Sequence, residues 1–534
     1  MARVAAKGYS IAAGCAILRP MDTLTAAPHA GHGKAALCKD MTQGSISRQL
    51  VTFAVPLILG NFFQLTYNAV DSIILGRFAG KEALAAAGIA NPIMNIMIFC
   101  IVGISWGAGV LISEFYGRKD FARLKSEVST TLVVGFAFTV IVSAACFALA
   151  VPILCLVRAP AQLRAPSAWY LRIIFCGLPC TFFYNMFAAA LRAIGDSKTP
   201  IVCVAVSAVL NGALDFVLVA VCGLGMTGAA VATVAAQAVA CALCVGFVYL
   251  RSPLVAVHPC DFHVDASLLR KTASYSLAGA MQQTVLYVGK LLVQSAVNPL
   301  GVDAIATFNA GTKVDDFCYQ PEQSIGQAMT TLVAQNRGAG NYQRIRQGLW
   351  RGLLIEFGYG VLIGAAVIVL RGPLMHLFAG ADEAEVLRLG RRYLLIMALL
   401  YTLPAVTNGI QGFFRGMGSM NVTVVATTVQ MTARAGCSLL LAPRFGIAGI
   451  AISCGIGWFC MMVYEVPLLV RWRASAWCGT LLFGGAGFRT VRNAAFCASR
   501  LPHGAERRLL PWAGFRMARN AAFCAGRLPH GAEA

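Results

Sequence analysis

Long apolar segments recur along this chain of 534 residues, and each is about as long as a membrane-crossing helix. A helix needs about 20 apolar residues to cross roughly 30 Å of hydrocarbon. The alternating pattern of a transmembrane β-barrel would look different. We therefore predict an all-α integral membrane protein with twelve transmembrane helices, in contact with membrane lipids. The twelve blocks are 50–75, 84–111, 129–154, 168–191, 200–222, 227–250, 272–297, 304–334, 350–370, 393–413, 420–442 and 446–470.

Composition supports the membrane assignment and excludes other classes. Hydrophobic residues make up 58% of the chain and charged residues only 12%, whereas soluble proteins carry about 25% charged residues. The net charge of +21 is spread over loops and both ends. Because no basic stripe is interleaved with aromatic residues, we expect no nucleic-acid partner.

Basic residues concentrate in every second loop. They follow the second, fourth, sixth, eighth and tenth blocks, and Arg192 and Arg415 are expected to lie in two of these loops. Since positive charge marks the cytoplasmic side, both termini are predicted to be cytoplasmic.

An internal repeat divides the chain into two halves. Gly80 recurs as Gly301 and Gly117 as Gly338, each 221 positions later. Arg192 and Gly195 recur as Arg415 and Gly418 after a slip of two. Six helices per repeat, an even number, make both halves enter the membrane in the same direction. We predict two parallel, pseudo-symmetric six-helix bundles around a central cavity.

Two carboxylates lie inside apolar blocks, where a charge costs at least ~2.5 kcal/mol and usually serves transport. They are Asp71 in the first block and Asp215 in the fifth. Asn211 precedes Asp215 by four residues and shares its helix face. Spacings of three, four and seven place further polar residues on the face of Asp71, namely Gln64, Tyr67 and Asn68. The two faces are expected to meet.

Several motifs together resemble the multidrug and toxic compound extrusion (MATE) family of transporters. They are VPLILGNFFQLTYNAVDSIILGRFAG, LRAIGDSKTP, LNGALDF and VAQNRGAGN, within residues 41–470. The resemblance implies a twelve-helix antiporter of the bacterial plasma membrane, driven by protons or sodium and acting as a monomer without a cofactor. It also implies a cation site at Asp71, Asn211 and Asp215, with Thr233 as a further oxygen ligand. Oxygen ligands suit sodium, and paired carboxylates equally suit protons.

The carboxyl-terminal half lacks this site, because Asp215 aligns with Ser438 and Asn211 with Arg434. It carries other charges within its spans, including Lys290, Asp315 and Asp316. They form either a structural ion-paired cluster or a wall of the substrate cavity. In the second case acid from both halves would favour organic cations as substrates.

The expected organisation has five parts. Residues 1–40 are an extension of doubtful origin, and 256–271 are a cytoplasmic linker between the amino-terminal half (41–255) and the carboxyl-terminal half (272–472). Residues 473–534 form a basic tail containing a near-identical duplication. Within the first block, Pro56 is a candidate hinge because proline removes a helical hydrogen bond.

Two other functional classes fit less well. A flippase for lipid-linked oligosaccharides would share the architecture, but it is expected to use a cationic cavity. A membrane enzyme would need a nucleophile with a base, or a metal cluster, at membrane depth. Neither occurs in the predicted spans, so no enzymatic activity is expected. We favour a multidrug efflux antiporter that exports small organic cations or amphiphilic drugs.

Overall fold

The computed structural model describes residues 40–157, 159–258, 261–377 and 383–477. The amino-terminal half forms six membrane-length helices, two of which end in short π-helical segments. These segments, Leu75–Ala79 and Phe216–Val221, continue α1 and α5. The helices are α1 (Ile46–Ile74), α2 (Gly80–Arg118), α3 (Phe121–Leu156), α4 (Ala161–Ala193), α5 (Lys198–Asp215) and α6 (Gly225–Arg251).

The carboxyl-terminal half repeats this arrangement with one helix broken in two. Its helices are α7 (Ala266–Val297), α8 (Val302–Gly338), α9 (Tyr342–His376), α10 (Ala384–Leu400), α11 (Thr402–Gly416), α12 (Met420–Phe445) and α13 (Ile447–Trp477). A short 3₁₀ turn, Asn298–Leu300, links α7 to α8. The described residues contain no strand. The chain divides into units Met1–Val466 and Pro467–Ala534, and residues 467–477 of the second unit are helical.

All twelve predicted blocks are helical in the structure, although their hydropathy differs. Among the described residues, nine helices are long and apolar enough to cross a membrane by length and composition. A tenth span is the pair α10 and α11, bent by 45°. The single block expected at 393–413 is thus broken, and Pro404 lies in the first turn of α11, where its missing N–H costs no hydrogen bond. Helices α7 and α8 reach the length of a span, with 32 and 37 residues, but are more polar.

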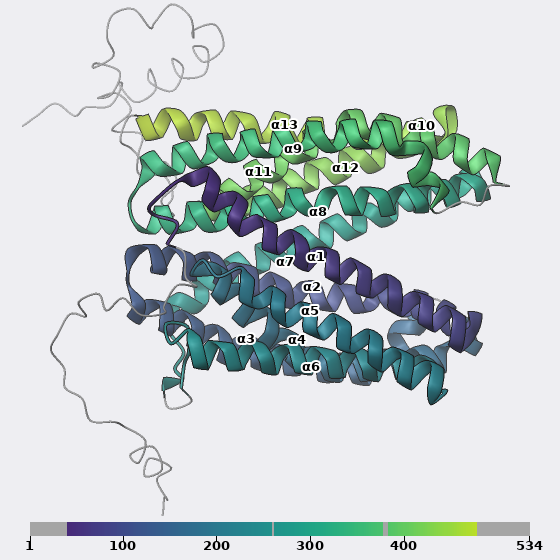
Figure 1. Ribbon diagram of the computed structural model, residues 1–534, viewed down its shortest axis with the longest axis horizontal. Coiled ribbons are helices and arrows are strands. Elements are labelled where there is room, and N and C mark those ends of the chain that lie inside the picture. The colour runs from purple at the N-terminus through teal and green to yellow at the C-terminus, as the bar shows by residue number, and fades with distance from the viewer. Residues whose placement is uncertain (1–39, 158, 259–260, 378–382, 478–534) are drawn as a thin grey trace, which may run out of the picture. The chain divides into compact units, whose positions relative to one another are not determined.

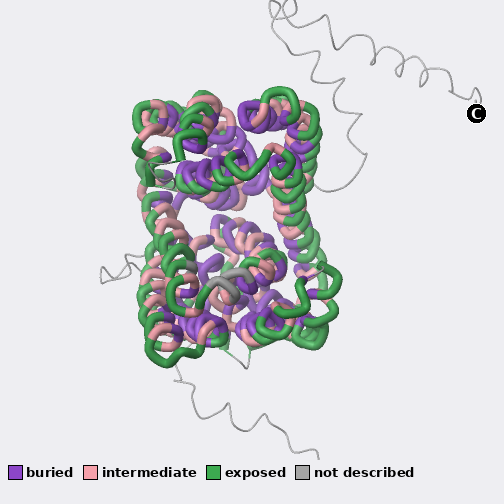
Figure 2. The backbone as a smooth tube through the Cα atoms, turned by 90° about the vertical axis from the view of Figure 1, so that its right-hand side faces the viewer, coloured by how far each residue is buried: buried purple, intermediate pink, exposed green. Residues whose placement is uncertain are grey.

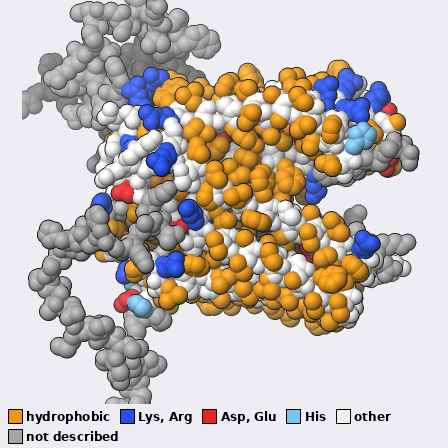
Figure 3. All heavy atoms as spheres, viewed as in Figure 1, with side chains coloured by type: hydrophobic (Ala, Val, Ile, Leu, Met, Phe, Trp, Pro, Cys, Tyr) orange, Lys and Arg blue, Asp and Glu red, His pale blue; other side chains and the backbone are white. Residues whose placement is uncertain are grey.

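Each half is stabilised by its own hydrophobic core. One consists of residues between Leu75 and Leu268, the other of residues between Val293 and Trp458. Figure 1 shows the helices of each half lying side by side, and Figure 2 views them end on, with buried residues gathered inside each half. Figure 3 shows apolar side chains over the middle of one face and most Lys and Arg side chains toward the helix ends. This distribution matches a hydrocarbon belt between two aqueous interfaces.

The repeat is visible in how two corresponding helices begin. Asp120 caps α3 by accepting a hydrogen bond from the Arg123 N–H at 3.1 Å. Asn341 caps α9 in the same way, accepting from the Arg344 N–H at 3.1 Å. An oxygen at this position satisfies one of the free N–H groups of a helix start. The two caps are 221 residues apart and confirm the repeat found in the sequence.

Other expectations about the chain have mixed outcomes. Helix α1 runs through Pro56 without a break in its assignment, so a hinge there stays a prediction. The extension 1–40 lies outside the described residues except for Asp40, and the duplicated tail from 478 onward lies outside them entirely.

Candidate functional site: buried carboxylates of the amino-terminal half

The structure brings Asp71 and Asp215 together. Helix α1 packs along α5, and the two carboxyl groups lie close enough to interact. Each aspartate lies close to a change of helix type. Asp215 is the last residue of α5, and Asp71 lies one turn before the π segment 75–79. π-helical turns widen a helix locally and occur often at functional sites. The two π segments contact each other, with Phe78 and Phe216 edge to face at 6.1 Å.

Hydroxyl groups surround the carboxylate pair. Tyr67, one turn before Asp71, lies beside both carboxylates and beside Thr233 of α6. Tyr170 of α4 also lies near both carboxylates and near Tyr67. The Thr233 hydroxyl donates to the Ala229 carbonyl at 2.9 Å, which leaves its lone pairs available. Four helices therefore contribute oxygen atoms to one site.

Several polar atoms of this site are buried without a hydrogen-bond partner. They are one carboxylate oxygen of Asp71, both carboxylate oxygens of Asp215, and both amide atoms of Asn211. Asp215 is fully buried and Asn211 is 1% exposed. Neither aspartate forms an ion pair with a described lysine or arginine. Buried polar groups are normally satisfied, so this cluster of orphaned atoms needs an explanation.

A bound cation or a shared proton would satisfy these atoms. Two adjacent carboxylates in a low dielectric cannot both remain ionised without a counter-charge. Carboxylate, amide and hydroxyl oxygens are ligands for a hard cation such as sodium, and they can equally share protons. The arrangement can therefore hold a positive charge and release it.

The other predicted site residues lie elsewhere. Gln64 and Asn68 are exposed on α1, and their place in the substrate cavity stays a prediction. Lys290 of α7 pairs with Asp316 of α8 at 3.8 Å, and both side chains are about half exposed. Asp315 is buried and accepts hydrogen bonds from Tyr393 at 2.8 Å and Tyr401 at 2.7 Å. Asp315 is thus part of the packed interior of its half and not an open cavity wall.

Five residues of functional interest were missed or misplaced in the sequence. Tyr170 carries no signal, because a tyrosine in an apolar block is ordinary. Glu356 and Glu465 are fully buried in α9 and α13, and the rule that singled out Asp71 would have found them. Arg192 and Arg415 were expected in loops, but they belong to the last turns of α4 and α11. The apolar stretch of each helix ends before the helix does.

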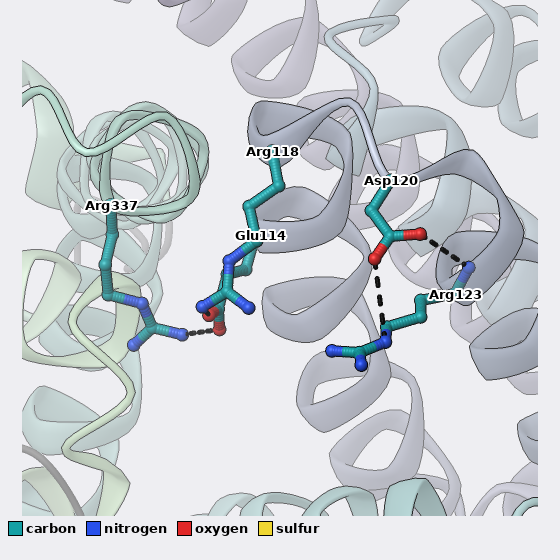
Figure 4. Close-up of polar contacts among 5 residues, drawn as sticks. All are labelled: Glu114, Arg118, Asp120, Arg123 and Arg337. Atoms are coloured by element: carbon teal, nitrogen blue, oxygen red, sulfur yellow. Dashed lines mark hydrogen bonds and ion pairs between the residues drawn. The ribbon is translucent and has the colours of Figure 1, made fainter.

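A junction between the halves closes one end of the molecule. Glu114 of α2 forms ion pairs with Arg118 on its own helix and with Arg337 of α8 (Figure 4). A Cβ added at Gly117 would overlap the Gln335 carbonyl, and one added at Gly338 would overlap the Glu114 carbonyl. These repeat-related glycines therefore let the two backbones touch. Figure 3 shows the surface hollowed between the halves at the opposite end.

Comparisons with known proteins identify the family. The MatE family model matches residues 56–217 and 279–438. The "Probable multidrug resistance protein YpnP" of Bacillus subtilis is 27% identical, with 78% of this chain and 93% of that protein covered. The "Probable multidrug resistance protein YoeA" of the same organism is 30% identical, with 70% of this chain and 82% of that protein covered.

Solved structures agree on the fold. A structure described as an outward-facing multidrug resistance MATE family transporter of the MOP superfamily superposes with a TM-score of 0.77 at 19% identity. The match covers 82% of this chain and 98% of that one. The chain therefore belongs to the MatE family of multi-pass membrane transporters.

Proposed function

We propose that this protein exports small organic cations or amphiphilic drugs across the bacterial plasma membrane in exchange for protons or sodium ions. The observation that carries the proposal is the pair Asp71 and Asp215, with five buried polar atoms at the site lacking partners. A carboxylate at membrane depth that forms no ion pair with a described lysine or arginine suits an ion that binds and is released during transport.

Besides an ion site, an antiporter needs a cavity that is closed at one end, and the junction between the halves supports this. Glu114, Gly117, Arg337 and Gly338 close the end that carries basic loops, which the charge pattern assigns to the cytoplasm. The hollow between the halves then faces outward. Alternating access requires this junction to open when the outer end closes. A cavity between two halves of one chain needs no second subunit, which fits a monomer.

Ion binding can be transmitted through the π segments. A cation or proton between Asp71 and Asp215 would remove the repulsion between the two carboxylates and allow α1 and α5 to pack more closely. Because residues 75–79 and 216–221 contact each other just beyond the carboxylates, α1 would repack there. The occupied and empty states of the site would then favour different cavity shapes.

Uptake of a cationic dye into inverted membrane vesicles tests the proposal. A proton gradient and a sodium gradient are imposed separately on vesicles containing the protein, with rhodamine 6G as the dye. We expect uptake with one of the two gradients and none without either. Uptake indifferent to both gradients would refute antiport.

A further inference from the structure

A pocket between the two halves has only arginines as charged lining residues. Helices α2 and α4 line it from one half, α8 and α11 from the other. Arg192 and Arg415 are among its lining residues, one from each half, and no described carboxylate lines it. The pocket therefore has the opposite polarity to the site at Asp71 and Asp215.

The two arginines differ in what balances their charge. Arg415 is 8% exposed, its Nε has no hydrogen-bond partner, and its guanidinium lies 5.5 Å from the ring centre of Trp106. The buried carboxyl groups of Glu356 and Glu465 lie near it, outside the pocket lining. Arg192 forms no ion pair with any described carboxylate. Its nearest ionisable neighbours are Tyr184 and Cys244, which are neutral at physiological pH.

The remaining lining leaves the arginines as the chief hydrogen-bond donors. The hydroxyl of Ser113 donates to a carbonyl of its own helix, and those of Thr330 and Thr331 do the same. The guanidinium groups, the amide of Gln327 and the indole N–H of Trp106 therefore remain to contact a ligand. Arginine recognises carboxylate and phosphate through paired, charge-assisted hydrogen bonds. Trp106 adds a flat apolar surface beside them.

We propose that this pocket binds an anionic group, a carboxylate or phosphate, of the transported compound. This inference rests on the proposed export function and predicts that, among its substrates, amphiphiles that carry such a group, including zwitterions, bind more tightly than those that lack it. An anion between Arg192 and Arg415 would contact both halves at once. Binding and release of the anion would then be coupled to the separation of the two halves, as transport between the halves requires.

Helix ends offer a simpler reason for the two arginines. A cation in the last turn of a helix interacts favourably with the helix dipole, and both residues occupy such positions. That role predicts no discrimination between ligands by charge. A ligand pair that differs in one carboxylate therefore separates the two explanations.

Rhodamine B and its ethyl ester form such a pair, because esterification removes the carboxylate and keeps the ring system. Fluorescence anisotropy of each dye with the purified protein measures binding directly. A charge-assisted hydrogen bond is worth about 1.5 to 3 kcal/mol. We expect the acid to bind roughly tenfold to a hundredfold more tightly than the ester.

Three variants test whether the preference for the acid over the ester depends on Arg192. Arg192→Gln should bind the acid and the ester with similar affinity, whereas Arg192→Lys should retain part of the preference because it keeps the charge. Arg172→Gln is the matched control, since Arg172 lies on the same helix, outside the pocket lining and beside Phe147 and Trp169. It should behave like the wild type.

Equal binding of both dyes to the wild type would overturn the inference, and so would a preference that survives Arg192→Gln. Repeating the assay in nanodiscs with neutral or anionic lipid separates a transported compound from a lipid headgroup. A preference lost only in anionic nanodiscs would assign the pocket to lipid and overturn our assignment. Gradient-driven export of the ester in vesicles tests the proposed function separately, because it needs no anionic group.

Discussion

The junction between the halves should weaken when Gly117 is replaced by alanine. The new Cβ would lie 2.8 Å from the Cα of Gln335 and would overlap the carbonyl oxygen of the same residue. Real Cβ atoms essentially never approach other atoms within 3.0 Å. Both obstructing atoms belong to the backbone of α8, so no side-chain rotation can relieve the contact. The two helices must separate.

The size of the effect follows from the steric overlap alone, because α2 is helical in both the closed and the open junction and the helix propensity of alanine cancels. Overpacking costs typically about 1 to 3 kcal/mol. The closed junction should therefore lose about 2 kcal/mol relative to the open one, a shift of roughly 30-fold. Each half has its own hydrophobic core, so the halves should stay folded.

Hydrogen exchange followed by mass spectrometry measures this shift. Exchange of the peptides that cover 114–120 and 335–341 should accelerate in Gly117→Ala by up to about 30-fold. Gly246→Ala is the matched control, because a Cβ there meets nothing within 4 Å. Exchange at the junction that is equal in Gly117→Ala and wild type, with both proteins folded, would refute the reasoning.

Three further predictions concern the junction, the carboxyl-terminal half and the tail. Glu114→Gln should also favour the open junction, but by only about 1 kcal/mol, because it removes the ion pair to Arg337. Hydrogen exchange of the same peptides measures this shift, and unchanged exchange would contradict it. Tyr401→Phe removes one of two hydrogen bonds to the buried Asp315 and should cost about 1.5 to 3 kcal/mol in thermal unfolding without changing which ion drives transport; a changed ion would place Asp315 in the coupling site. Deletion of residues 474–534 should leave dye transport unchanged at equal membrane levels, and lost transport would give the tail a role.

The sequence contained enough information for the helical architecture, because the length of an apolar block is set by the thickness of a membrane. It also paired Asp71 with Asp215, since a lone carboxylate in an apolar block is costly enough to be informative. The π segments that follow these residues could not be predicted, because 75–79 and 216–221 contain no proline and consist of apolar residues apart from Arg77. Helix type there depends on packing between α1, α5 and α6.

The inter-half pocket could be foreseen only in part. The repeat relates Arg192 to Arg415, but the sequence does not reveal that α4 and α11 continue past their apolar stretches and turn both side chains inward. The sequence left two alternatives open for the charges of α7 and α8, and in the structure Asp315 contacts Tyr393 and Tyr401 while Lys290 pairs with Asp316. The rotation of α8 about its own axis decides whether Asp315 faces a cavity or contacts Tyr393 and Tyr401. The spacing of apolar residues predicts this rotation poorly in a helix as polar as α8.

Competition between ion and substrate at the amino-terminal carboxylates tests the central claim most directly. Equilibrium binding of rhodamine 6G to purified protein is titrated with sodium at fixed pH and then with acid at fixed sodium, for the wild type and for Asp215→Asn. Asparagine keeps the shape of Asp215 and removes its charge, so the variant should fold normally.

We expect one of the two ions to weaken dye binding in the wild type, and dye to weaken binding of that ion by the same factor, as linkage requires. In Asp215→Asn, and likewise in Asp71→Asn, dye affinity should no longer respond to the ion. An unchanged ion dependence in both variants would contradict the account and place the coupling site elsewhere in the protein.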